Sequence, residues 1–202
     1  MSTVLVLNSS AAGAESVSRL LVADAVAALK AKDAGLTVIE HDLAADPVPH
    51  LSPEAVVGVR TGDTSTPERA AAVALSDKLV AELKAADYVV IGSPMYNFGI
   101  TSTLKAWFDY VLRAGVTFRY TEKGPEGLVG AKKAIVVASR GGLYSEGPFK
   151  AADSQEPHLR TMLGFIGITD VTFVYAERLG FGPEVREKAI ADARGVIGKL
   201  AA

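Results

Sequence analysis

Three segments of the sequence combine residue types that can hold a flat, phosphorylated ligand. The first, residues 8–18, is rich in hydroxyl and small side chains and leads into an amphipathic stretch. The N-terminus of a helix offers unpaired N–H groups and partial positive charge, so a phosphate fits there. A serine N-cap followed by a flexible loop is the alternative. Neither the dinucleotide fingerprint nor the P-loop pattern is present, which favours a mononucleotide.

The second segment, residues 92–99, follows an apolar run and contains two aromatic residues and a methionine. Met95, Tyr96 and Phe98 could form walls around a flat aromatic ligand. Asn97 tolerates unusual backbone geometry and could direct a peptide N–H towards that ligand. The alternative is a turn that buries Tyr96 and Phe98 in the core, which would leave backbone polar groups without partners.

The third segment is Ser139-Arg140-Gly141-Gly142, which follows another apolar run. Paired glycines allow the backbone to approach a planar ring closely, with N–H groups free to donate. An ordinary turn explains the same residues equally well. The three segments together are stronger evidence for a ligand site than any one of them.

Other kinds of chemistry lack support. No Gly-x-Ser-x-Gly motif occurs, and Ser93 is followed by proline. The three histidines lack the spacing of metal ligands, so we expect no metal. Cysteine is absent, which excludes disulfides, iron–sulfur clusters and thiol catalysis.

Short β-branched runs alternate with longer amphipathic stretches along the whole chain. We predict strands over residues 3–7, 36–40, 88–92, 134–138 and 171–175. We predict helices over residues 16–32, 66–86, 101–113, 158–166 and 183–200. A proline-punctuated loop is expected from residue 47 to about residue 65. The alternation predicts one α/β domain over residues 1–202, with a parallel sheet covered on both faces.

In such sheets, ligands bind beyond the carboxyl ends of the strands, where the connection order reverses. The three segments follow the first, third and fourth predicted strands, so they are expected to meet at one edge of the sheet. Lys and Arg number 21 against 23 Asp and Glu, which leaves no basic excess for nucleic acid. No export signal or membrane-spanning apolar run is present, so we expect a cytoplasmic protein.

Several long stretches also match a known family. The sequence resembles the FMN-dependent NADH-azoreductases, which are flavodoxin-like NAD(P)H:quinone oxidoreductases, in residues 94–98, 105–110, 113–122, 124–128, 139–142 and 163–170. This resemblance implies a flavodoxin-like α/β fold whose five-stranded parallel sheet has the order 2-1-3-4-5. It also implies bound FMN and a homodimer with the site at the subunit interface, while the sequence itself predicts no membrane or metal partner.

The resemblance further implies which residues bind the cofactor and substrate. The FMN phosphate would be held by Ser10, Ser16, Val17 and Ser18. The isoalloxazine ring would pack against Met95, Tyr96, Asn97 and Phe98. The pyrimidine side of the ring would contact Ser139, Arg140, Gly141 and Gly142. Tyr120 and Phe165 are candidates for lining the substrate cavity, although either could be a core residue.

The implied reaction is a ping-pong exchange of two electrons. NADH or NADPH gives a hydride to FMN, and an azo compound or a quinone then takes the electrons, so no acid–base residue is obligatory. A non-enzymatic flavodoxin-like electron carrier and a flavin-linked regulatory protein are the alternatives. Electron carriers tend to be strongly acidic, and a formal charge of −2 argues against that reading. Arg60 could meet a nucleotide phosphate or simply be solvated.

Overall fold

Five parallel strands form the central sheet of the computed structural model, which describes residues 1–201. They are β1 (Thr3–Asn8), β2 (Thr37–Asp42), β3 (Tyr88–Pro94), β6 (Lys133–Ser139) and β7 (Asp170–Ala176). Their order is β2-β1-β3-β6-β7 and every neighbouring pair is parallel, which confirms the predicted fold. The connection order reverses between β1 and β3, where this kind of sheet binds ligands.

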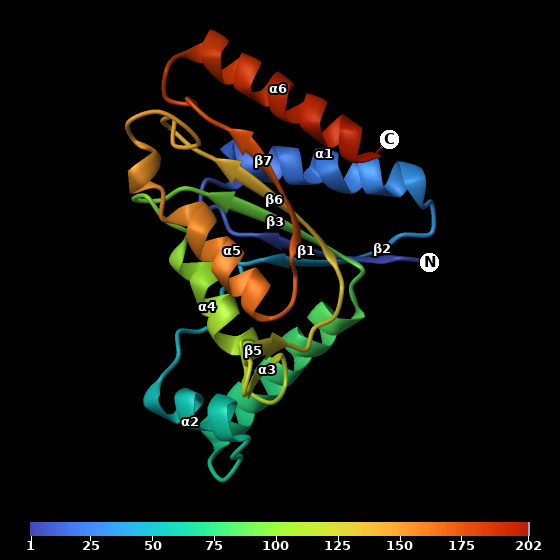
Figure 1. The fold of residues 1–202 in the computed structure, drawn as a ribbon, viewed down its shortest axis with the longest axis vertical. Coiled ribbons are helices and arrows are strands. Elements are labelled where there is room, and N and C mark those ends of the chain that lie inside the picture. Colours follow the sequence, from blue (N-terminus) through green and yellow to red (C-terminus); the bar gives the residue numbers. More distant parts are fainter. Residues whose placement is uncertain (202) are drawn as a thin grey trace.

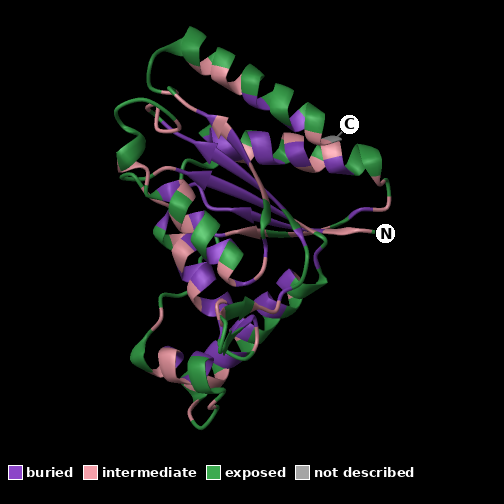
Figure 2. Ribbon diagram, viewed as in Figure 1, coloured by how far each residue is buried: buried purple, intermediate pink, exposed green. Residues whose placement is uncertain are grey.

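Helices cover both faces of the sheet (Figure 1). One face packs against α1 (Val17–Lys32) and α6 (Pro183–Ala201), and the other packs against α3 (Pro67–Ala85), α4 (Ser102–Val111) and α5 (Gln155–Phe165). Side chains of a strand alternate between the two cores: Val4 and Val6 face α1, whereas Leu5 and Leu7 face the opposite layer. The three central strands β1, β3 and β6 are therefore buried on both sides, as Figure 2 shows, whereas the edge strand β2 is partly exposed.

The strand register brings the three ligand-binding candidates to one edge. Asn8 at the end of β1 pairs with Gly92, and Pro94 at the end of β3 pairs with Ser139 at the end of β6. The segments after these strands therefore begin within two residues of one another along the strand direction. The position predicted for the site follows from this register.

The predicted loop over residues 47–65 is wrong in its second half, which contains helix α2 (Pro53–Thr61). Ser52 is the N-cap and accepts a hydrogen bond from the Ala55 N–H, while Pro53 occupies the first turn. Gly62 ends the helix with a φ of 74°. Proline suits the first turn of a helix, so its presence did not exclude one here.

Replacing the N-cap residue of α2 is expected to destabilise this helix modestly. In a Ser52→Ala variant the Ala55 N–H loses its acceptor, so the free energy of unfolding should fall by about 1 kcal/mol. Chemical denaturation measures this change. An unchanged midpoint, together with unchanged hydrogen exchange in α2, would contradict the assigned cap.

A β-hairpin was also missed. Strands β4 (Phe118–Thr121) and β5 (Gly124–Gly127) pair antiparallel below the ends of α4 and α5. Four-residue strands carry too little periodicity to be recognised. Short 3₁₀ turns occur at Gly13–Glu15 and Lys150–Ala152, and α5 begins three residues before its predicted start. Among the described residues, no helix is both long and apolar enough to span a membrane.

Candidate functional site

Hydrogen bonds join the three segments into one structure at the carboxyl edge of the sheet. Ser9 Oγ donates to the Gly92 carbonyl at 2.7 Å, which links the first segment to the second. The Tyr96 hydroxyl accepts a hydrogen bond from the Ala11 N–H at 3.1 Å. The Met95 N–H donates to the Ser139 carbonyl at 2.8 Å and links the second segment to the third.

The first segment ends at the N-terminus of α1. Ser16 is the N-cap and accepts from the Arg19 N–H, and its Oγ lies 3.1 Å from Ser18 Oγ. Ser10 and Ser18 are also buried. Within residues 1–201, the N–H groups of Val17 and Ser18 have no hydrogen-bond acceptor. Free N–H donors and hydroxyls at a helix N-terminus are the groups that anion sites in proteins use.

The second segment forms a tight turn with strained backbone. Tyr96 and Gly99 exchange two backbone hydrogen bonds, of 3.0 and 3.1 Å. Between them, Asn97 has a φ of 48° and Phe98 a φ of 72°, which is unusual for a bulky residue. Such strain is typical of functional sites. The N–H groups of Asn97 and Phe98 lack an acceptor in the described chain.

Exposure settles the alternative that this turn is a core element. The side chains of Tyr96 and Phe98 are 39% and 51% exposed, so neither is buried in the core. Met95 is partly buried and Asn97 is exposed. The turn therefore presents aromatic surface and two free N–H donors to the outside, as the ligand hypothesis expects.

The third segment leaves open space beside Gly141 but not beside Gly142. A Cβ atom built on Gly141 meets no atom within 4 Å, whereas one on Gly142 would lie 3.0 Å from Cε2 of Tyr144. The N–H groups of both glycines have no acceptor among residues 1–201. Ser139 is buried beside them. A planar group can therefore approach the backbone at Gly141, next to two N–H groups that have no acceptor within residues 1–201.

Arg140 occupies a different position from the two glycines. Its fully buried side chain donates to Asp153, Gln155 and Glu177 at 2.8, 2.9 and 3.0 Å. Its guanidinium group also lies over the ring of Tyr175, 5.1 Å from the centroid. With these partners, the side chain points into the protein rather than into the open space beside Gly141.

Sequence reasoning missed the partners of Arg140. The three partners lie 13, 15 and 37 residues further along the chain, and no spacing pattern marks them. Burial raises the pKa of Glu177, but hydrogen bonds from Ser145, Tyr144 and Arg140 outweigh it and hold the pKa below the ordinary value. Glu177 is therefore a charged acceptor behind the third segment.

Tyr120 and Phe165 form an aromatic cluster with Phe118, at some distance from the three segments. The Phe165 ring centroid lies 4.5 Å from that of Phe118 and 6.4 Å from that of Tyr120. Helix α5 begins beside the second segment, where the Ser154 N–H donates to the Phe98 carbonyl. Phe165 ends that 11-residue helix. The cluster thus lies about 16 Å along the helix from the second segment.

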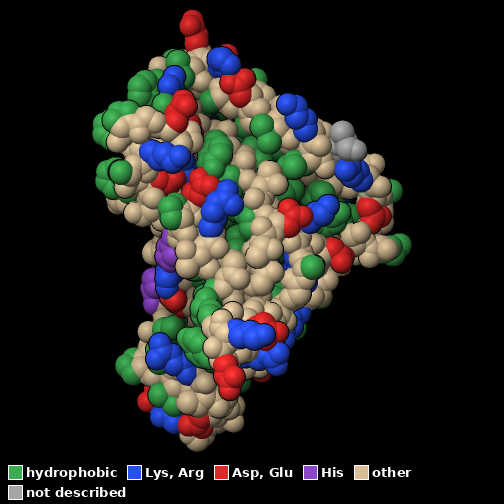
Figure 3. Space-filling model, viewed as in Figure 1, with side chains coloured by type: hydrophobic (Ala, Val, Ile, Leu, Met, Phe, Trp, Pro, Cys, Tyr) green, Lys and Arg blue, Asp and Glu red, His purple; other side chains and the backbone are tan. Residues whose placement is uncertain are grey.

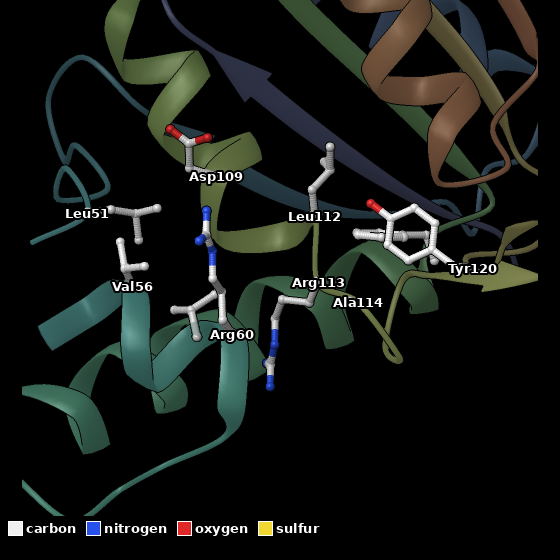
Figure 4. A pocket seen from close by; sticks show the side chains of 10 residues that line it. Leu51, Val56, Arg60, Asp109, Leu112, Arg113, Ala114 and Tyr120 are labelled. Atoms are coloured by element: carbon white, nitrogen blue, oxygen red, sulfur yellow. The ribbon is translucent and has the colours of Figure 1, made fainter. Parts of the chain in front are cut away.

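A separate cavity of about 380 Å³ lies between α2 and the C-terminal end of α4. Arg60 and Asp109 line it together with Leu51, Val56 and Tyr120 (Figure 4). Arg60 lies in helix α2 rather than in the predicted loop, and its side chain extends towards α4 in Figure 4. This cavity does not include residues of the three segments.

Comparisons with known proteins agree with this architecture. A family model described as "Flavodoxin-like fold" matches residues 2–200. A protein of Hyphomonas neptunium named FMN-dependent NADH:quinone oxidoreductase is 59% identical over all of this chain and 96% of its own length. The crystal structure of an azoreductase from Bacillus anthracis has a TM-score of 0.91 at 34% identity, and covers all of this chain and 99% of its own.

A second solved structure shares the same fold. It is titled an FMN-dependent NADH-azoreductase from Bacillus anthracis in complex with FMN, and has a TM-score of 0.88 at 25% identity over the full length of both chains. Relatives and structures thus agree along the whole chain. The chain therefore belongs to the flavodoxin-like family and, within it, to the FMN-dependent NADH:quinone oxidoreductases and azoreductases.

Proposed function

We propose that the protein is an FMN-dependent oxidoreductase that uses NADH to reduce quinones and azo compounds. The observation that carries the proposal is the arrangement of free N–H donors around the open space beside Gly141, with an anion-binding helix terminus at the same sheet edge. The names of the relatives support both the cofactor and the two acceptor classes. We treat the whole chain as one FMN-binding domain.

The residues of the first segment fit the phosphate of FMN. Val17 and Ser18 offer free N–H groups at the positive end of α1, and the hydroxyls of Ser10, Ser16 and Ser18 add donors. No acidic residue lies in the first turn of α1. A dianionic phosphate would therefore meet donors and the favourable end of the helix dipole.

The second and third segments fit the ring of FMN. Met95, Tyr96 and Phe98 would contact one region of the ring, and the free N–H groups of Asn97 and Phe98 lie in the same turn. Ser139 and the backbone of Arg140 would support Gly141 and Gly142 at the pyrimidine side. When bound, FMN supplies the two-electron chemistry by accepting a hydride from NADH and passing the electrons to the acceptor.

The protein's own contribution to the reaction is electrostatic and geometric. The N–H dipoles of Gly141 and Gly142 would stabilise negative charge on the pyrimidine side of the reduced ring. Residues 95–98 would hold first NADH and then the quinone or azo compound against the exposed face of the flavin ring. This positioning lowers the entropic cost of each transfer. No side chain of this chain needs to act as an acid or base.

We also propose that the protein is a homodimer whose site is completed by a second copy. Tyr120 and Phe165 lie about one helix length from the second segment of their own chain, so they cannot line a cavity beside it. Tyr120 is 73% exposed, which leaves it available to a neighbour. The aromatic cluster of one copy would then cover the flavin site of the other.

Steady-state oxidation of NADH tests the proposed function. We expect turnover that depends on added FMN and on a quinone or azo dye, and parallel lines in double-reciprocal plots at several acceptor concentrations. An electron carrier or a regulatory protein would bind FMN but show no sustained NADH oxidation. Basic and acidic side chains are interspersed on the face in Figure 3, and the net charge is only −2, so no strongly acidic docking surface favours the carrier.

A further inference from the structure

Residues 177–180, which follow β7, pair with the back of the third segment. The N–H groups of Arg178, Leu179 and Gly180 donate to the carbonyls of Gly142, Arg140 and Gly141 at 2.8, 3.1 and 3.0 Å. A Cβ atom on Gly180 would lie only 3.3 Å from the Gly141 oxygen, so the two backbones approach closely. This segment therefore fixes the carbonyl directions of three consecutive residues.

The carbonyl directions determine where the free N–H groups point. In a trans peptide group the C=O and the N–H point in opposite directions, and the structure has no cis peptide among its described residues. The Arg140 carbonyl faces Leu179, so the Gly141 N–H points away from residues 177–180. The Gly141 carbonyl faces Gly180, so the Gly142 N–H does the same.

Glu177 holds both ends of the glycine turn. Its carboxylate accepts from Arg140 Nη1 at 3.0 Å, before the turn, and from the N–H groups of Tyr144 and Ser145 at 2.9 and 3.0 Å, after it. Ser145 Oγ is a fourth donor. The Glu177 side chain is only 10% exposed. A buried carboxylate with four donors fixes its partners more firmly than a neutral acceptor would.

Backbone strain marks the same segment. Arg178 has a φ of 60°, in the left-handed region that residues other than glycine rarely adopt. Its N–H donates to the Gly142 carbonyl, and the preceding residue, Glu177, binds Arg140 through its side chain. Strain that the surroundings maintain in this way is typical of positions that serve a ligand site.

We propose that Glu177 is a positioning residue, which together with residues 178–180 aims the Gly141 and Gly142 N–H groups at the flavin ring. This inference rests on the proposed function, because it requires that FMN binds beside those glycines. Glu177 does not touch the ring itself. It acts through Arg140, Tyr144 and Ser145. Its role is to keep the Gly141 and Gly142 N–H groups pointing towards the ring position before FMN binds.

The test compares Glu177→Gln with Glu156→Gln. Glu156 is the matched control because it is also partly buried and hydrogen-bonded, to Tyr175 and Arg160, but forms no hydrogen bond with residues 139–145. We expect Glu177→Gln to weaken FMN and riboflavin binding equally, by about tenfold, since the ring and not the phosphate is affected. Glu156→Gln should leave both affinities within about twofold of the wild type.

The reduction potential of the bound flavin gives the second measurement. Misaimed N–H dipoles stabilise the reduced ring less, so the potential of Glu177→Gln should become more negative. Removing a negative charge near the ring would by itself shift the potential in the positive direction. A positive shift, or an unchanged potential at full occupancy with unchanged affinity, would overturn the inference.

A milder variant keeps the test decisive if Glu177→Gln does not fold. Ser145→Ala removes one of the four donors and should weaken the binding of both flavins about threefold, with a smaller negative shift in potential. Unchanged binding and potential in a folded Ser145→Ala variant would then contradict the inference. If the wild type itself does not bind FMN, the proposed function fails, and that outcome is distinguished from a failure of Glu177 alone.

Discussion

Replacing Gly141 with valine is expected to weaken FMN binding about 100-fold, or ~2.7 kcal/mol, without unfolding the protein. A Cβ at this position meets no atom within 4 Å, and the φ of Gly141 lies outside the left-handed region. The protein can therefore accept the side chain. The added methyl groups would instead occupy the open space where a flavin ring approaches the backbone.

Fluorescence titration of the variant with FMN measures this loss. Gly195→Val is a matched control, because a Cβ on Gly195, in α6, also meets nothing within 4 Å and lies far from the three segments. Circular dichroism checks that both variants fold. If folded Gly141→Val binds FMN as tightly as the control does, the ring does not lie beside the third segment.

The second large effect is expected from Ser18→Ala, which should weaken FMN about 30-fold and riboflavin less than about twofold. A hydrogen bond to a charged group contributes about 1.5–3 kcal/mol, and only FMN carries the phosphate. Ser18 is the better choice for this test than Ser16, because Ser16 also caps α1. The only side-chain partner of Ser18 Oγ within residues 1–201 is Ser16 Oγ.

Parallel titrations with FMN and riboflavin measure the two affinities. Ser52→Ala is a suitable control because it removes a serine N-cap from α2, away from the three segments. It should leave both affinities unchanged. Equal losses of FMN and riboflavin in Ser18→Ala would move the phosphate to another part of the protein.

The fold was predictable because the sequence pattern that specifies it is local and recurs along the chain. Each strand of the sheet is a short apolar run, and each is separated from the next by an amphipathic helix, which permits few topologies. Helix α2 was missed because Pro53, together with the preceding Pro47 and Pro49, was interpreted as loop punctuation. Yet Ser52-Pro53-Glu54 carries the same start signal as Thr66-Pro67-Glu68, where a helix was correctly predicted.

The site was predictable only where a segment follows a strand directly. The segments after β1, β3 and β6 had to meet at the carboxyl edge, and their hydrogen bonds confirm that they do. What holds them in place was not predictable. Glu177 and Asp153 approach Arg140 from separate elements, and a buried ion pair between distant residues leaves no periodic pattern in the sequence.

A crystal structure of the protein grown with FMN tests the central claim most directly. The account predicts that the phosphate lies against Ser16 and Ser18 at the start of α1, with the ring over Gly141 and beside the turn at Asn97. Flavin density elsewhere, for example in the cavity between α2 and α4, would contradict the account. Crystals grown at a saturating concentration of FMN that show no flavin density at the carboxyl edge of the sheet would also contradict it.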